Sequence, residues 1–302
     1  MAEDDKAAPR FLAVGHDGLR MTSDNGTDWS EPELGKEGEV YRFARYGNGR
    51  FVTAGRYGGI NIYASSPDGI EWQTGTRDAR YARYITGLAF GNGQFLAFGG
   101  DAVSVGRAQP FALTSKDGVE WGESADTEGA YVLRRAAWGN DRWVGVGDRG
   151  RRAVSTDGLK WEEAPGSEPK KRKVGETCID IAFGNGVFVG VGLHGLRMKT
   201  EDGLAWSEPQ RGEEGEHLNS VLWTGEQFVA MGAGATYFSK DGTDWARHPN
   251  TDAPLTAAFG NGIYVGAKWK GRLMHSTDAV EWKQTRRAEQ HVEGLCFGGG
   301  TP

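Results

Sequence analysis

The sequence predicts an all-β fold, a seven-bladed β-propeller whose blades are four-stranded antiparallel sheets. Three observations predict it. One short motif occurs seven times along the 302 residues, a hairpin signal recurs before the copies of that motif, and the two ends of the chain hold complementary parts of one blade. The composition agrees, because 48 glycines and 11 tryptophans are typical of a chain with many tight turns between short strands.

The repeated motif is Ser-x-Asp-Gly-x-x-Trp, with Asn25 replacing Asp in the first copy and Ala279 replacing Gly in the last. Its tryptophans follow one another at intervals of 43, 49, 40, 45, 39 and 37 residues, which match one four-stranded blade each. Asp and Ser side chains accept hydrogen bonds from turn amides, and Trp offers a large apolar surface, so we expect a structural role without catalysis. The residues assigned to this role are Trp29, Asp68, Trp72, Asp117, Trp121, Asp157, Trp161, Asp202, Trp206, Asp241, Trp245, Asp278 and Trp282.

An aromatic residue followed by Gly-Asn-Gly, or by a variant of it, precedes an alternating apolar run in each repeat. Phe90-Gly91-Asn92-Gly93, for example, leads into residues 95–99. Asn-Gly between two apolar runs is the strongest short hairpin signal, because both central residues take a positive φ. Each repeat is therefore predicted as strand A, an Asn-Gly turn, strand B, a Gly-rich turn, strand C, the Ser-x-Asp-Gly turn and strand D.

The two ends of the chain predict that the array of blades closes into a ring. The first strand, at residues 11–15, is a strand B with no strand A before it, and the last strand is a strand A without a partner. Joined, these parts complete one blade and remove the free edges of an open array. The expected organisation is a disordered tail at 1–9 and one propeller at 10–302, with the first blade shared between 10–34 and 293–300.

The motif resembles the box of the Asp-box (BNR-repeat) propellers, which include sialidases and sialidase-like proteins. The usual box has one more residue between Asp and Gly, and only residues 22–29 fit that longer spacing. The resemblance implies that the box is a folding element remote from the ligand site, and that an active sialidase has an Arg-Ile-Pro motif, an arginine triad and a Tyr–Glu pair. Arg-Ile-Pro is absent and spacing nominates no Tyr–Glu pair. The arginines at recurring strand-C positions are interpreted as features of the repeat: Arg20, Arg152, Arg197 and Arg272.

The order of the strands sorts the loops onto two faces. The A–B and C–D turns share one face and are nearly uniform, whereas the B–C turns and D–A connections share the other and vary in length and charge. Binding residues concentrate on loops held by a rigid scaffold, so we expect the working surface on the variable face. Aromatic, Arg, His and Asp side chains there suit stacking on sugar rings or hydrogen bonds to hydroxyl and carboxylate groups. The candidate ligand-binding residues are His16, Asp17, Arg56, Tyr57, Arg80, Tyr81, Tyr84, Asp148, Arg149, His194, Lys268 and Trp269.

The inner strands offer a second candidate site, in the channel of the ring. Arg135 and Asp180 each lie three residues before the aromatic of strand A in neighbouring blades, so we expect them to meet near the channel. A structural ion pair is the favoured interpretation, because a buried charge needs a partner. Cys178 and Cys296 lie on blades three steps apart, and we expect two buried thiols that form no disulfide.

These observations favour a non-catalytic recognition propeller that binds a glycan, a small polar ligand or a protein partner on its variable face. A carbohydrate-active hydrolase or lyase with carboxylates from different blades stays open, since such a pair needs no linear motif, and so does an assembly scaffold. No zinc spacing, Walker loop or Gly-x-Ser-x-Gly elbow occurs, and no cofactor or metal is expected. A net charge of −6 argues against nucleic acid, no apolar run is long enough to span a membrane, and a monomer is expected.

Two segments bear on location and on charge. The polar start of the chain shows no signal peptide and would fit a mature N-terminus with an added Met, which slightly favours a periplasmic or secreted location and leaves a cytoplasmic one open. Residues 170–173, Lys-Lys-Arg-Lys, are similar to a short nuclear import signal or a basic patch. We interpret them as a solvated D–A connection that faces Glu213, Glu214 and Glu216 of the next connection.

Overall fold

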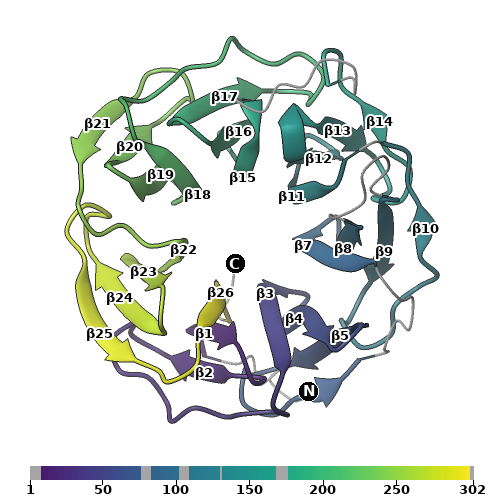
Figure 1. Ribbon diagram of the computed structural model, residues 1–302, viewed down its shortest axis with the longest axis vertical. Coiled ribbons are helices and arrows are strands. Elements are labelled where there is room, and N and C mark those ends of the chain that lie inside the picture. The colour runs from purple at the N-terminus through teal and green to yellow at the C-terminus, as the bar shows by residue number, and fades with distance from the viewer. Residues whose placement is uncertain (1–7, 76–82, 102–108, 130, 168–175, 300–302) are drawn as a thin grey trace, which may run out of the picture.

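The fold is a closed ring of seven antiparallel sheets around a central channel (Figure 1). It confirms the predicted seven-bladed propeller. The described residues include a short 3-10 turn at Asp148–Gly150, and no helix among them is long and apolar enough to cross a membrane. The computed structural model describes residues 8–75, 83–101, 109–129, 131–167 and 176–299.

We number the blades along the chain and give their strands from the channel outwards as A to D. Blade 2 consists of β3 (Glu39–Gly47), β4 (Arg50–Tyr57), β5 (Ile60–Ser66) and β6 (Gln73–Thr74). Blade 3 consists of β7 (Tyr84–Gly91), β8 (Gln94–Gly100), β9 (Phe111–Ser115) and β10 (Ala125–Asp126). Blade 4 consists of β11 (Leu133–Gly139), β12 (Arg142–Gly147), β13 (Arg152–Ser155) and β14 (Glu162–Glu163). Blade 5 consists of β15 (Cys178–Gly184), β16 (Val187–Gly192) and β17 (Leu196–Thr200). Blade 6 consists of β18 (His217–Trp223), β19 (Phe228–Ala233), β20 (Ala235–Ser239) and β21 (Ala246–Pro249). Blade 7 consists of β22 (Thr256–Gly260), β23 (Ile263–Lys268), β24 (Arg272–Ser276) and β25 (Lys283–Arg287).

Blade 1 is built from both ends of the chain, as the sequence predicts. Its strand A is β26 (Val292–Gly298), which pairs with β1 (Arg10–Gly15), and β1 pairs in turn with β2 (Arg20–Ser23). The register places Arg10 opposite Gly298. Since β26 also packs against β3 and β22 of the two neighbouring blades, the ring is closed.

The outermost strand is reduced to a single bridge in blades 1 and 5. Arg20 bridges Glu33 in blade 1, and Arg197 bridges Gln210 in blade 5, where the other blades have a strand D. Both segments follow the sequence Trp-Ser-Glu-Pro, and a proline cannot donate a hydrogen bond to the ladder. The fourth position is therefore held by a shorter pairing in these two blades.

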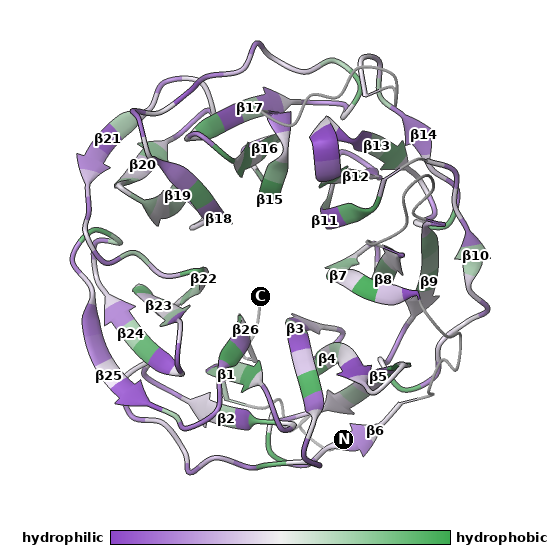
Figure 2. Ribbon diagram, viewed as in Figure 1, coloured by the Kyte–Doolittle hydropathy of each residue, from purple (hydrophilic) through white to green (hydrophobic). Residues whose placement is uncertain are grey.

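The apolar core lies between adjacent blades. One cluster, for example, joins Phe11 and Met21 of blade 1 to Val265 and Leu273 of blade 7. The outermost strands have a different character, and Figure 2 shows β14, β21 and β25 as hydrophilic. Burial of a Phe, Leu, Val or Met side chain contributes about 1.5–3 kcal/mol, so the contacts between blades are a main source of the ring's stability.

The Asn-Gly turns also join one blade to the next. Asn48, Asn92 and Asn140 take φ angles of 48°, 50° and 45°, as this hairpin requires. In addition, Nδ2 of Asn48 donates to the carbonyl oxygens of Gly93 (2.8 Å) and Lys116 (2.9 Å) in blade 3. The uniform face therefore consists of turns that are bonded across blades.

Each Ser-x-Asp-Gly turn is closed by its own side chains. In blade 4, Oδ1 of Asp157 accepts the backbone N–H groups two and three residues further on, both at 2.8 Å, and the Ser155 hydroxyl accepts that of Gly158 at 2.8 Å. The indole of Trp161 donates to the Gly158 carbonyl, also at 2.8 Å. The same carboxylate contacts recur at Asp68, Asp117, Asp202, Asp241 and Asp278.

The box of blade 1 uses the same short spacing as the others. Oδ1 of Asn25 accepts the backbone N–H groups two and three residues further on, both at 2.9 Å. Asp24, which the longer spacing within residues 22–29 would place in this role, pairs instead with Arg10 at 3.3 Å. The indole N–H of Trp29 is buried without a hydrogen-bond partner in the described part of the chain, unlike the other box tryptophans.

The box glycines lie against the preceding blade. A Cβ on Gly118 would be 2.3 Å from Cγ2 of Val52, and a Cβ on Gly242 would be 2.7 Å from Cγ2 of Val189. Ala279, which replaces Gly in the last box, takes a φ of 59° and buries its methyl group in the cluster between blades 6 and 7. The boxes are therefore contacts between blades as well as turns.

Candidate functional site

The variable face of the ring is formed by the B–C turns and the D–A connections, because the strands of every blade are antiparallel. The uniform face is formed by the Asn-Gly turns and the boxes. The hydrogen bonds of the uniform face engage the Asn side chains of its turns and the Ser and Asp side chains of its boxes. The variable face and the channel hold the candidate site residues that the sequence predicts.

Four ring and carboxylate side chains meet on the variable face where blades 7 and 1 adjoin. Nε2 of His16 lies 3.0 Å from Oε1 of Glu293, and the rings of His16 and His291 are 5.5 Å apart in an edge-on arrangement. The indole of Trp269 lies 4.8 Å from the His291 ring, and Trp269 is 63% exposed. Burial lowers the pKa of His291 despite the nearby carboxylate of Glu293. The exposed indole of Trp269 therefore packs against the ring of His291, which in turn packs against the ring of His16.

Cation–aromatic pairs continue the variable face around blades 2 and 3. Nζ of Lys36 lies 5.9 Å from the centre of the Tyr57 ring, and the Arg56 guanidinium lies 5.3 Å from that of Tyr84. Such contacts contribute about 0.5–1 kcal/mol at exposed sites. They restrain long side chains that would otherwise move freely in solvent.

Blade 4 presents a similar group on its B–C turn. The guanidinium of Arg149 lies 5.3 Å from the Tyr131 ring, and Asp148 forms an ion pair with Arg134. Arg149 takes a φ of 56°, and its N–H donates to Oγ1 of Thr177 at 3.1 Å. The two predicted residues of this turn thus lie on the variable face, each with a partner.

Asp17, His194 and Lys268 hold the loops of the variable face in shape. Asp17 takes a φ of 53°, and its Oδ1 accepts a backbone N–H of the next D–A connection at 3.0 Å. His194 takes a φ of 59°, and its N–H donates to Nδ1 of His217 at 3.2 Å. Nζ of Lys268 pairs with Oδ1 of Asp252. Arg80, Tyr81 and residues 170–173 lie outside the described residues.

A buried polar cluster that sequence reasoning missed joins blades 5 and 6. Oε2 of Glu216 accepts the Tyr237 hydroxyl at 2.5 Å, and Oε1 accepts two N–H groups of Arg247 at 2.8 and 2.6 Å. The guanidinium of Arg197 stacks 3.8 Å from the Tyr237 ring. Burial of Glu216 opposes its ionisation, but the hydrogen bonds from Tyr237 and Arg247 outweigh it and lower the pKa of this carboxyl. Glu213 also pairs with Arg247, at 2.8 Å.

One signal in the sequence marks this cluster. The connections after blades 1 and 5 share the pattern Trp-Ser-Glu-Pro-x-x-Gly-x-Glu-Gly-Glu, which ends at Glu39 and Glu216. In each connection Oε2 of the last Glu accepts the backbone N–H of the residue three positions earlier, at 3.1 Å and 3.0 Å. Both glutamates are buried, so the pattern identifies connections closed by their own carboxylate.

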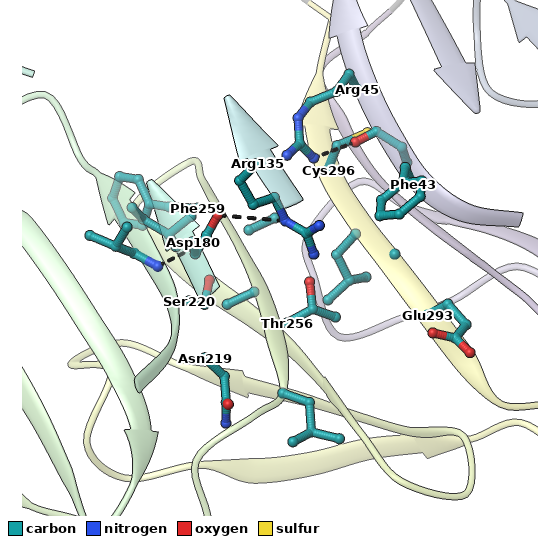
Figure 3. Close-up of a pocket in the computed structure, with 18 of the residues that line it drawn as sticks. Phe43, Arg45, Arg135, Asp180, Asn219, Ser220, Thr256, Phe259, Glu293 and Cys296 are labelled. Atoms are coloured by element: carbon teal, nitrogen blue, oxygen red, sulfur yellow. Dashed lines mark hydrogen bonds and ion pairs between the residues drawn. The ribbon is translucent and has the colours of Figure 1, made fainter. Parts of the chain in front are cut away.

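In the channel, Arg135 and Asp180 come together as the register predicts. Nε of Arg135 lies 3.7 Å from Oδ1 of Asp180, while Oδ2 of Asp180 accepts the N–H of Val221 at 3.0 Å (Figure 3). Their side chains are 30% and 16% exposed, respectively. The two residues border a cavity of about 240 Å³ that is lined by the inner strands of six blades.

Three further charged side chains line the same cavity, and the sequence count missed them. Arg42 and Arg45 come from β3, and Glu293 comes from β26. Counting three residues back from each aromatic samples one position per inner strand, whereas Arg45 lies one residue before its aromatic and Arg42 lies four before it. The cavity therefore has more charged groups than the single predicted pair.

Burial sets the titration of the groups in the channel wall. It raises the pKa of Asp180, and the charges of Arg135 and Arg45 and the N–H of Val221 offset this in part. Burial likewise lowers the pKa of Arg135, although the guanidinium keeps its proton at any ordinary pH. Cys296, in the wall of the same cavity, is a free thiol whose pKa burial raises to about 12.

Cys178 is also a free buried thiol, as expected. The described residues contain no group of three or more His, Cys, Asp or Glu side chains placed to hold a metal ion.

No protein-family model matches the chain, and no curated protein matches it. Several solved structures, however, match the chain. The designed protein Ika8 matches with a TM-score of 0.63 and 13% identity, covering 97% of this chain and 91% of its own. YCF48 bound to a D1 peptide matches with a TM-score of 0.59 and 17% identity over 86% and 85%. A 6-phosphogluconolactonase-like protein from Bacteroides fragilis NCTC 9343 matches with a TM-score of 0.64 and 7% identity over 98% and 100%.

Identities this low show the fold alone. The chain is a seven-bladed β-propeller, and this fold is consistent with a binding or scaffold role. Its membership of the Asp-box family stays a prediction, because the comparisons support the propeller and no particular family.

Proposed function

We propose that this protein is a non-catalytic recognition propeller that binds a protein partner through an arc of its variable face. The arc runs over blades 7, 1, 2 and 3 and is formed by His16, Arg56, Tyr57, Tyr84, Trp269 and His291. The exposure of Trp269 carries the proposal, because 63% of this residue is open to solvent on a B–C turn. Trp, Tyr and Arg are the residues that most often contribute the largest part of the binding energy at protein interfaces.

The surroundings of Trp269 support an interface. His291 lies against one side of the indole, and the pairs Lys36–Tyr57 and Arg56–Tyr84 restrain the other rings of the arc. Side chains that are already ordered lose less entropy on binding, so a partner gains more from each contact.

The charged groups of the channel support binding over hydrolysis. A glycosidase needs two carboxyl groups about 5–9.5 Å apart and free to act on substrate. The two carboxylates that line the channel cavity are Asp180, which pairs with Arg135, and Glu293, which pairs with His16. Each is thus already held by a cationic or imidazole side chain.

A selection from a phage-displayed peptide library tests the proposal. We expect the purified protein to enrich related sequences, and we expect synthetic peptides of those sequences to lose binding to the variant with Arg56, Tyr57 and Trp269 changed to Ala. Ile70→Ala is the matched control, because Ile70 is 55% exposed but lies on the uniform face. This variant should bind the peptides like the wild type.

A glycan array run on the same two variants separates the sugar-binding alternative. Binding to one sugar class that the triple variant loses, with no enrichment of peptides, would show that the arc recognises a glycan. Equal peptide binding by the triple variant and the wild type would contradict the proposed surface.

A further inference from the structure

Arg45 is the one charged residue among the seven residues at its level of the channel. In every blade the residue just before the strand-A aromatic lies at an equivalent position. The seven residues at this level are Arg45, Ala89, Ala137, Ala182, Leu222, Ala258 and Cys296. Six are uncharged and small or apolar, and one is a guanidinium that points into a partly enclosed space. A charge placed there is costly unless something offsets it.

The charges around the channel cavity do not balance. Arg45 donates to the carbonyl of its own neighbour, Ala44, at 2.8 Å, and forms no ion pair with a carboxylate of the described residues. Nε of Arg135 lies 3.7 Å from Oδ1 of Asp180, which is longer than a charge-assisted hydrogen bond. The Arg135 guanidinium also lies 5.2 Å from the centre of the Phe43 ring. Two half-buried guanidinium groups thus lie near a single carboxylate, that of Asp180.

The rest of the cavity wall leaves the positive charge in excess. Glu293, the second carboxylate of the wall, lies 3.0 Å from Nε2 of His16, and Arg42 adds a third guanidinium group next to Phe43. Ser220 and Thr256 offer neutral hydroxyl groups near Arg135 (Figure 3). The wall therefore combines excess positive charge with hydroxyl donors, which is the donor set of a site for an oxygen anion.

The size of the cavity limits what this anion can be. At about 240 Å³ it lies just below the ~300–1,000 Å³ that is typical of pockets for drug-sized ligands. A carboxylate or phosphate group with a few further heavy atoms fits such a volume better than a sugar chain. Attraction to Arg45 and Arg135 is also stronger here than at an open surface, because the surroundings screen charge less than bulk water.

We propose that the channel binds a small oxyanion, a carboxylate or phosphate group, between Arg45 and Arg135 with Ser220 and Thr256 as additional donors. Asp180 holds Arg135 from the opposite side and limits the affinity. This site is separate from the arc on the variable face, so it does not depend on the partner proposed there.

Isothermal titration calorimetry with inorganic phosphate and with citrate, in a low-chloride buffer, tests the site. We expect saturable binding of one anion per chain. Arg45→Gln should weaken that binding roughly 10- to 100-fold, since one charge-assisted contact is lost. Arg287→Gln, which removes an exposed arginine of β25 and the same net charge, should leave the affinity unchanged.

Asp180→Asn gives a prediction of opposite sign. The amide oxygen can still accept the N–H of Val221, but the negative charge that competes for Arg135 is gone. We therefore expect tighter anion binding, which a variant that merely disturbs the fold would not produce. Circular dichroism of each variant checks that the blades are formed.

The two anions distinguish the chemistry of the ligand. Tighter binding of citrate, reproduced by acetate at higher concentration, would assign the site to carboxylates, and tighter binding of phosphate would assign it to phosphate groups. The proposal is overturned if neither anion binds saturably to the folded wild type, or if Arg45→Gln binds as tightly as Arg287→Gln.

Discussion

At the residue scale, the box glycines have to meet two requirements at once. Gly118 takes a φ of 71°, and a Cβ on it would lie 2.3 Å from Val52 of the preceding blade. Gly93, in an Asn-Gly turn, takes a φ of 65° but has no atom within 4 Å of the place where its Cβ would stand. The two glycines therefore separate the cost of a left-handed backbone from the cost of packing between blades.

We expect Gly118→Ala to lower the free energy of unfolding by more than Gly93→Ala does. Both variants force alanine into a left-handed conformation, which costs about 1–2 kcal/mol. Gly118→Ala also overpacks the contact with Val52, which adds about 1–3 kcal/mol. Urea unfolding of the two variants measures the difference, and equal losses would show that the box does not pack tightly on its neighbour.

The same scale shows what the sequence could reveal of the candidate site. Arg135 and Asp180 were found because the repeat fixes which residues of neighbouring blades share a level. Arg45 was missed because its importance lies in the charge balance of a cavity, which depends on where several side chains point. The contact between His16 and Glu293 was missed for the same reason. The two residues are 277 positions apart, and their contact depends on the direction in which each side chain points.

At the element scale, the box acts as a turn whose stability depends on an ionised carboxylate. Burial opposes ionisation of Asp157, but the N–H groups of Lys160 and Leu159 and the hydroxyl of Ser155 outweigh it, so that its pKa is lowered below 3.8. A group with a lowered pKa in the folded state stabilises that state above its unfolded pKa. This contribution is lost as the pH falls through the folded-state pKa. Asn25 shows that an amide can serve in the same position.

Asp157→Asn should therefore change how the stability responds to acid. At pH 7 we expect a loss of about 1 kcal/mol, because the amide oxygen still accepts the turn N–H groups but carries no charge. The difference from the wild type should shrink in acid, as the pH falls through the lowered pKa of the wild-type carboxyl. Urea unfolding between pH 7 and pH 3 measures it, and a difference that stays constant with pH would argue against an ionised role.

The elements that the sequence predicted best are those with local causes. The Asn-Gly hairpins and the boxes were predicted because each turn is set by side chains within a few residues. The short strand D of blades 1 and 5 was not predicted, although Pro32 and Pro209 lie in the sequence. Whether a chain pairs at the outer edge of a sheet depends on contacts with the neighbouring blade, which a local pattern does not contain.

At the scale of the whole molecule, the ring depends on one pairing between distant segments. β26 supplies the innermost strand of blade 1 and packs against both neighbouring blades. Without it, β1 would have an unpaired edge, and such edges favour pairing with another chain. The closure is thus both a contribution to stability and a protection against association.

A chain that ends at residue 291 tests this closure. We expect a lower melting temperature and the appearance of dimers or larger species in light scattering coupled to size exclusion. A chain shortened only by residues 300–302, beyond the end of β26, is the control and should behave like the full chain. A truncated protein that stayed monomeric and melted with the full chain would show that β26 is dispensable.

The pairing of β1 with β26 also sets an order of events during synthesis. Arg10 emerges from the ribosome almost 300 residues before its partner Gly298. Closing so long a loop adds little to the equilibrium cost, about 0.6 kcal/mol for each doubling of length, but distant pairings form slowly. The edge of β1 therefore stays unpaired until β26 has been synthesised, while the other six blades form. Production of this protein should accordingly be limited by aggregation of nascent chains more than by instability of the finished ring.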